Sequence, residues 1–175
     1  MSAPLKCMFD TRAFNLMLDG PVAVEALKGR VRAYATHIQR DEINNTKDSE
    51  RRAALLQVFS DVVAESVPTD SLVIGVSRVV AARLGGERVV PTASAVWDVS
   101  RWDQASWGAN DNLYSTLKAD LDKLNKNKRN NVQDALIAKT SIKGLYVLIT
   151  DDADLIEVTK RYGGRYLSLE ELLRQ

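Results

Sequence analysis

Short apolar runs alternate with helical patterns near both ends of the chain, and this alternation restricts the fold more than any other feature. The run LYVLIT at 145–150 is apolar almost throughout, which is typical of a strand covered on both faces. The run at 5–9 and the alternating pattern at 31–36 indicate two more strands. Helices between parallel strands form right-handed crossovers and cover both faces of a sheet. The sequence therefore predicts an α/β fold with a central, mainly parallel sheet.

The predicted helices rest on caps and on apolar spacing. Thr36 and Gln39 have the spacing of a capping box, so a helix is expected to begin after Thr36. The strongest amphipathic pattern covers 48–65, where apolar residues recur at i, i+3, i+4 and i+7. Further helices are expected after Pro21 as far as Gly29, at 112–126, at 132–143 with Gly144 as its C-cap, and at 152–161. A short strand is expected at 165–167, followed by a final helix at 168–175 that Ser168 caps.

The middle of the chain has no comparable pattern. Residues 71–76 favour a strand and 79–84 a helix, whereas 87–112 contain all three tryptophans and indicate a hairpin or a long excursion. The tryptophans could cover the core, stack on bases or contact a partner, and their spacing leaves these alternatives open. A chain of 175 residues suits one domain. We therefore expect a single domain over 1–175 with an insertion at about 66–115.

Composition excludes several classes of protein. Lys and Arg number 24 against 23 Asp and Glu, for a net charge of +1, so a uniformly basic nucleic-acid-binding surface is excluded and only a local basic patch is left. One cysteine, Cys7, and one histidine, His37, cannot form a zinc-finger type of site. No apolar stretch approaches 18 residues and none resembles a signal peptide. We expect a soluble, cytoplasmic protein without membrane contacts.

Four acids occupy positions that this topology brings together. Asp10 follows the first strand, and Asp152 follows the run at 145–150. Glu42 lies on the helix after Thr36, and Asp134 lies in the first turn of its helix. Ligands of parallel α/β sheets bind outside the carboxyl ends of the strands. Taken singly, these acids also have structural interpretations as turn residue, helix cap, helix-dipole partner or solvated helical residue.

The combination of the four acids points to a cation site. Carboxylates that converge from separate segments repel one another unless cations neutralise them. Ligand sets made only of oxygen select Mg²⁺ or Mn²⁺ over zinc. The sequence thus predicts an Mg²⁺ or Mn²⁺ site at the carboxyl end of the sheet.

Two parts of the chain resemble the PIN-domain nucleases. The stretch at 130–155 resembles the family's signature half, in which an Asp precedes a helix of small and apolar residues, a Gly, an apolar strand and a Thr-x-Asp sequence. Its matching residues are Asp134, Gly144 and Thr150-Asp151-Asp152. The segments KCMFDTRAFN and ATHIQRDEI resemble those that carry the family's first two acids, which match Asp10 and Glu42.

This resemblance implies a PIN-like three-layer α/β/α domain that acts as a metal-dependent endoribonuclease. Its catalytic and metal-binding acids would be Asp10, Glu42, Asp134 and Asp152, and Asp154 has the position of a further acid in many relatives. The hydroxyls of Thr11 and Thr150 would bind a carboxylate or a phosphate, with strand-end capping as the alternative. Apart from the resemblance, the basic residues of 118–129, of which the densest are Lys126, Lys128 and Arg129, could hold the phosphates beside a cut site. Alternatively, they form a solvated helix end whose charge complements the helix dipole.

The resemblance also implies partners. Many small members, the VapC-like toxins, belong to toxin–antitoxin pairs, so RNA, an antitoxin protein and a second copy of the chain are expected partners. Two alternatives stay open: a catalytically silent PIN-fold module that binds RNA or protein, and a DNA nuclease of the flap type, or a phosphatase, with the same carboxylate chemistry.

Overall fold

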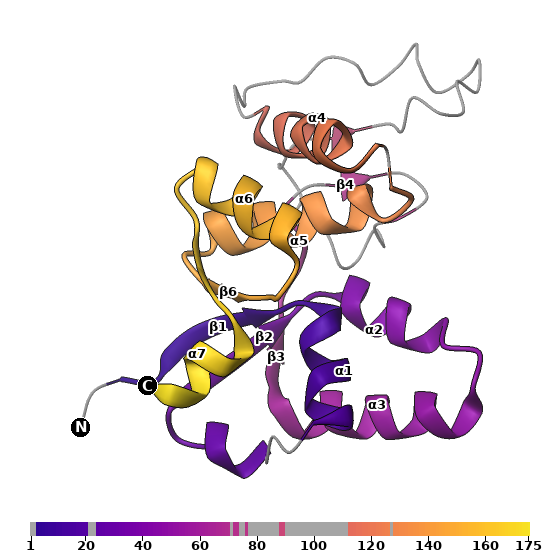
Figure 1. The fold of residues 1–175 in the computed structure, drawn as a ribbon, viewed down its shortest axis with the longest axis vertical. Coiled ribbons are helices and arrows are strands. Elements are labelled where there is room, and N and C mark those ends of the chain that lie inside the picture. The colour runs from indigo at the N-terminus through magenta and orange to yellow at the C-terminus, as the bar shows by residue number, and fades with distance from the viewer. Residues whose placement is uncertain are drawn as a thin grey trace.

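The structure is a computed structural model that describes residues 3–20, 24–70, 72–73, 76, 88–89, 112–126 and 128–175. Within these ranges a five-stranded, all-parallel sheet lies between two layers of helices (Figure 1). The predicted α/β class and parallel sheet are confirmed. The strand order is β3-β2-β1-β6-β7, and the strands are β1 (Leu5–Phe9), β2 (Val31–Ala35), β3 (Val63–Ser66), β6 (Val147–Ile149) and β7 (Arg165–Leu167).

The helices divide between the two faces of the sheet (Figure 1). The first layer holds α1 (Thr11–Asp19), α3 (Ser49–Val62) and α7 (Leu169–Arg174). The second holds α5 (Asn131–Lys143) and α6 (Ala153–Arg161), with α4 (Leu113–Asn125) packed against both. Two shorter elements complete the described helices, the 3₁₀ turn η1 (Val24–Leu27) and α2 (His37–Asn44). No helix in the described ranges is long and apolar enough to span a membrane.

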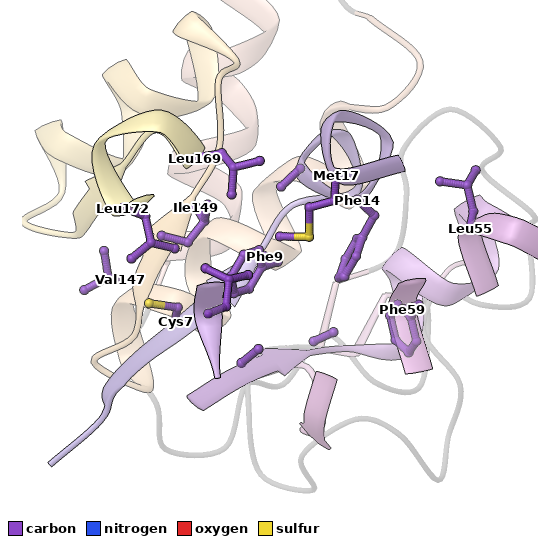
Figure 2. Packing of buried hydrophobic residues seen from close by; sticks show 14 of the residues in the cluster. Cys7, Phe9, Phe14, Met17, Leu55, Phe59, Val147, Ile149, Leu169 and Leu172 are labelled. Carbon is purple, nitrogen blue, oxygen red and sulfur yellow. The ribbon is translucent and has the colours of Figure 1, made fainter. Parts of the chain in front are cut away.

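Alternate residues of the central strands supply two separate cores. Cys7 and Phe9 of β1 point into the first layer, where Phe14 of α1 packs between Phe9 and Phe59 of α3 (Figure 2). Met8, between them in sequence, belongs to the core of the second layer. This period of two is the geometry of a strand with both faces covered, and it explains the apolar run of β6.

The second core depends on close packing of α5. Residues 135–138, Ala-Leu-Ile-Ala, are all fully buried, and they contact Leu148 of β6 and Leu117 and Leu121 of α4. The small alanines allow this helix to approach the sheet closely. The N-terminus of α5, which carries Asp134, is thereby held at the carboxyl end of the sheet.

The predicted caps are present. Thr36 and Gln39 form a complete capping box at the start of α2, and Ser168 and Glu171 form another at α7. Gly144 is the C-cap of α5, as predicted. The buried Gln39 side chain also donates from Nε2 to the carbonyl of Phe9 at 3.0 Å. This bond ties the first turn of α2 to the last residue of β1.

The helix predicted at 48–65 extends too far. α3 ends at Val62, and Val63–Ser66 form β3 beside β2. Val63 is β-branched and fits a pleated strand better than a helix, and pairing with β2 stabilises the strand. Two other predictions were incomplete: α1 was not anticipated, and after Pro21 there is only the 3₁₀ turn η1.

In the middle of the chain the structure describes a second, two-stranded sheet. β4 (Leu72–Val73) pairs in parallel with β5 (Arg88–Val89). A strand within 71–76 is thus confirmed. The helix predicted at 79–84 and most of 87–112, with the three tryptophans, lie outside the described residues.

Candidate active site

A pocket of about 690 Å³ opens at the carboxyl end of the sheet, beside the ends of β1 and β6. All four acids predicted for the site line it, although the first and the last of them are 142 residues apart in the sequence. The full lining consists of Asp10, Thr11, Arg12, Asn15, Glu42, Asn45, Lys128, Arg129, Asn130, Gln133, Asp134 and Asp152.

Asp10 is the most deeply placed acid. It follows β1 at the N-cap position of α1, but its side chain makes no capping hydrogen bond, so the interpretation of Asp10 as a cap does not hold. Only 7% of the residue is exposed. Its Oδ2 accepts a hydrogen bond from Thr150 Oγ1 at 3.0 Å. Burial raises the pKa of Asp10, and the bond from Thr150 opposes that rise.

Glu42 faces Asp10 from α2. The capping box and the bond from Gln39 to Phe9 position this helix, and Glu42 follows Gln39 by one turn. The half-buried Glu42 carboxylate accepts a hydrogen bond from the hydroxyl of Thr11. Burial raises the pKa of Glu42, the Thr11 bond lowers it, and the negative charge of Asp10 raises it.

Asp134 has a strongly raised pKa. It is half-buried in the first turn of α5. Burial raises the pKa of Asp134 to about 8, and the negative charges of Asp10, Glu42 and Asp152 contribute in that order. Lys128 offsets only part of this effect. A favourable interaction with the dipole at the start of α5 therefore does not explain the position of Asp134. The negative charges around Asp134 outweigh the positive charge of Lys128.

Asp152 has two roles at once. It is the N-cap of α6, where its Oδ1 accepts from the backbone N–H groups of Asp154 at 3.0 Å and Leu155 at 3.1 Å. It also lines the pocket, whereas its neighbour Asp151 does not. The cap and the site are thus compatible interpretations of the same residue. Asp154 is not part of the lining and pairs instead with Lys128, with Nζ and Oδ2 3.3 Å apart.

Thr150 connects two of the acids. The residue is fully buried, and its Oγ1 both donates to Asp10 and accepts from the backbone N–H of Asp152 at 3.1 Å. We expect Thr150→Val, which keeps the shape but removes both bonds, to lower the free energy of unfolding by about 1–3 kcal/mol. Urea unfolding monitored by circular dichroism measures this. Thr116→Val on the exposed part of α4 is the control, and an equal loss in both variants would contradict the role of Thr150.

Positive charge lines the same pocket. Lys128 and Arg129, which precede α5, and Arg12 of α1 are in its lining. Lys126 is not. It is exposed at the C-cap of α4 in the left-handed conformation (φ 56°).

The turn that carries these basic residues is held from within. Asn131 is buried, and its Nδ2 donates to Asp122 Oδ1 at 2.7 Å and to Asn125 Oδ1 at 2.8 Å. Asn125 in turn donates to Asn131 Oδ1 at 2.9 Å. These bonds fasten the start of α5 to the end of α4, so the backbone around Lys128 and Arg129 is anchored on both sides.

The sequence interpretation did not identify five polar residues of the pocket. One is Arg12, and the others are side-chain amides. Arg12 and the first amide lie on α1, a helix that was not anticipated. The five residues are Arg12, Asn15, Asn45, Asn130 and Gln133. Their closeness in sequence to the predicted site residues was a usable signal, because each lies within five residues of one.

The chemistry of the pocket fits a hard divalent cation. Four carboxylates face it, and oxygen ligands of this type suit Mg²⁺ or Mn²⁺. As the side chains stand, no three or more His, Cys, Asp or Glu residues of the described ranges are close enough together to hold an ion. Ion binding therefore requires rotation of carboxylate side chains toward one another, for which the pocket has room.

The site has to be interpreted from its own geometry. No protein-family model matches the chain, and no curated protein matches it. The convergence of the four acids, the raised pKa values of Asp10, Glu42 and Asp134, and the basic residues around them therefore carry the assignment.

Proposed function

We propose that the protein is an Mg²⁺- or Mn²⁺-dependent endoribonuclease with a PIN-like domain. One observation carries the proposal. Carboxylates from the end of β1, from α2, from the start of α5 and from the end of β6 meet in one pocket, where burial and the charges of the other three raise the pKa of Asp134 to about 8. Such a cluster is unfavourable for the protein by itself, and perturbed acids in a cleft are typical of functional sites.

The acids would hold the ion and orient the substrate. Asp10, Glu42, Asp134 and Asp152 are the ligands we assign. A divalent ion bound by them supplies Lewis acidity, which activates water and stabilises charge on the leaving oxygen of a phosphodiester. The one hydroxyl among the described residues that line the pocket, that of Thr11, already donates to Glu42. We therefore assign water as the nucleophile.

The other polar groups have supporting roles in this scheme. Thr150 and Thr11 hold Asp10 and Glu42 by hydrogen bonds, so the two hydroxyls orient carboxylates. The basic groups of Arg12, Lys128 and Arg129 would contact the phosphates on either side of the cut. The roles as a toxin, as the target of an antitoxin and as a homodimer stay predictions from the family resemblance.

The test is a cleavage assay on two polymers. Purified protein is incubated with total RNA and with single-stranded DNA in Mn²⁺, in Mg²⁺ or in EDTA. We expect discrete RNA fragments with either ion and none in EDTA. Cleavage of DNA alone would replace the proposal by the DNA-nuclease alternative. Binding of RNA without cleavage under every condition would replace it by the silent binding module.

The basic residues allow a matched comparison. We expect Lys128→Gln combined with Arg129→Gln to raise the KM for RNA several-fold. The slope of log K against log salt should become less steep by about 1.4, because each phosphate contact on a single strand contributes about 0.7. Fluorescence anisotropy with labelled RNA at several salt concentrations measures this. Lys126→Gln is the control, because Lys126 lies outside the pocket, and an equal effect there would contradict the assignment.

A further inference from the structure

Asp154 lies beside the pocket without lining it. It is the second residue of α6, and its backbone N–H donates to Asp152 Oδ1 at 3.0 Å. Its carboxylate Oδ2 is 3.3 Å from the Nζ of Lys128, which does line the pocket. The side chain of Asp154 is 30% exposed and that of Lys128 is 58% exposed. This ion pair joins the first turn of α6 to the turn before α5.

The Lys128 side chain is held at both of its ends. At the backbone, the N–H of Lys128 donates to Asn125 Oδ1 at 3.3 Å, and its carbonyl accepts from the N–H of Asn131 at 3.1 Å. A lysine side chain on a fixed backbone still loses much rotamer entropy when its ammonium is fixed in one place. The ion pair with Asp154 restricts that freedom at the far end. The ammonium of Lys128 therefore has a preferred position beside the pocket.

In this position the ammonium can still bind an anion. An ammonium group has three N–H donors, and the bond to Asp154 uses one of them. Its charge acts on the acids of the pocket, because Lys128 lowers the pKa of Asp134. A phosphate that enters the pocket meets Lys128, whereas the carboxylate of Asp154 lies outside the lining.

We propose that Asp154 is a positioning residue, which holds the ammonium of Lys128 for a phosphate of the substrate and does not bind the metal ion. This inference rests on the proposed nuclease function and deepens it. It also separates two neighbouring acids of the same helix start. Asp152 lines the pocket and is a ligand in the proposed scheme, whereas Asp154 acts through a lysine.

The inference predicts an effect opposite in sign to that of simple charge repulsion. Asp154→Asn removes a negative charge near the pocket, which by itself favours binding of RNA. If Asp154 holds Lys128, the variant instead binds RNA more weakly, by about two- to fivefold, the range for an exposed ion pair. Fluorescence anisotropy of the full chain with a fluorescein-labelled oligouridylate in EDTA measures this. The control is Glu157→Gln, which removes an exposed acid paired with Arg161 on the same helix and should not weaken binding.

A double-mutant cycle shows whether Asp154 acts through Lys128. In the Lys128→Gln protein, adding Asp154→Asn should no longer weaken binding. A purely structural effect on α6 would weaken binding equally in both backgrounds. That result overturns the inference, as does tighter or unchanged binding by Asp154→Asn alone. Absence of binding by the wild type also overturns it, because Lys128 then meets no phosphate.

Kinetics in Mn²⁺ give a second readout. The substrate is a short RNA that contains a cleavage site mapped in the total-RNA assay. Asp154→Asn should raise the KM by the same two- to fivefold with little change in kcat. A fall in kcat that additional Mn²⁺ restores would instead identify Asp154 as a metal ligand and overturn the inference.

Thermal melting with and without Mn²⁺ tests the metal directly, without cleavage. Asp154→Asn should keep the wild-type rise in Tm with Mn²⁺, whereas Asp152→Asn should lose most of it. Asparagine is also a good N-cap, so α6 keeps its cap in the second variant. An equal loss in both variants overturns the inference. A wild type that neither responds to Mn²⁺ nor cleaves RNA counts against the proposed function alone, and the binding cycle still decides the role of Asp154.

Discussion

Asp10→Asn is expected to abolish metal-dependent RNA cleavage, with a loss of at least about 10²-fold in kcat. Asp10 is the deepest of the four acids, and it receives the Thr150 hydrogen bond. Asparagine keeps the shape and an acceptor for Thr150, but it removes the charge that would bind the ion. Burial already raises the pKa of Asp10, so a neutral side chain at this position should leave the fold intact. Cleavage of the mapped RNA in Mn²⁺ measures the effect.

The matched control for Asp10→Asn is Asp61→Asn. Asp61 is an exposed carboxylate at the end of α3, where it accepts a hydrogen bond from Gln57 at 2.9 Å. The Asp61→Asn variant should retain full activity. Circular dichroism and thermal melting must show both variants folded. Full activity of a folded Asp10→Asn protein would show that the pocket is not the catalytic site.

The second large effect is a dependence of stability on pH that a divalent ion reverses. The folded protein holds the pKa of Asp134 at about 8, well above its ordinary value of 3.8. A carboxyl group with a raised pKa binds its proton more tightly in the folded state. Its contribution is therefore fully present below about pH 4 and is lost as the pH rises through about 8. Between these values the loss from this group is on the order of 1–3 kcal/mol.

Mn²⁺ or Mg²⁺ should offset this loss at alkaline pH, because a bound cation compensates the four negative charges. At a concentration 100 times its Kd, an ion that binds only the folded state adds about 2.7 kcal/mol, or about 5–10 °C in Tm for a domain of this size. Thermal melting at pH 5 and at pH 8.5, each with EDTA or Mn²⁺, measures both effects. The rise in Tm with Mn²⁺ should be larger at pH 8.5.

Asp134→Asn isolates the contribution of this residue. Without added ion, we expect the variant to be more stable than the wild type at pH 8.5 by about 1–2 kcal/mol. The reason is that asparagine removes the Asp134 carboxylate, which the other acids repel. The variant should gain much less from Mn²⁺. The same substitution at Asp61 should change neither quantity. A wild-type Tm that changes neither with pH nor with Mn²⁺ would contradict a cation site among these acids.

Local sequence patterns are sufficient to predict helix caps and single strands, but not the end of α3. The caps at Thr36 and Ser168 and the alternation in β2 are local, and each was predicted from a few neighbouring residues. The end of α3 was not. Val63 and Ala64 continue a helical pattern in sequence, but pairing with β2 places them in a strand. That contact joins residues about 30 positions apart, and a local pattern contains no information on it.

The four acids were predicted as a set because parallel topology brings the carboxyl ends of the strands to one edge. Their surroundings were not predicted. Arg12 and Asn15 reach the pocket through α1, and Gln133 depends on how α5 lies against the sheet. Thr150 was predicted with two alternative roles, and the structure shows both: its hydroxyl donates to Asp10 and accepts from the backbone N–H of Asp152 after the strand.

By itself, the sequence determined the α/β class, the parallel sheet and the convergence of Asp10, Glu42, Asp134 and Asp152, because strand direction and side-chain period follow from local patterns and general topology. Only the tertiary structure decided how strongly Asp134 holds its proton and which groups surround the four acids. The pKa of Asp134 depends on burial and on three carboxylates from other segments, and the ion pair of Lys128 with Asp154 depends on how α6 lies beside the start of α5. Burial and electrostatic interactions act through space, so they exist only once the segments are assembled.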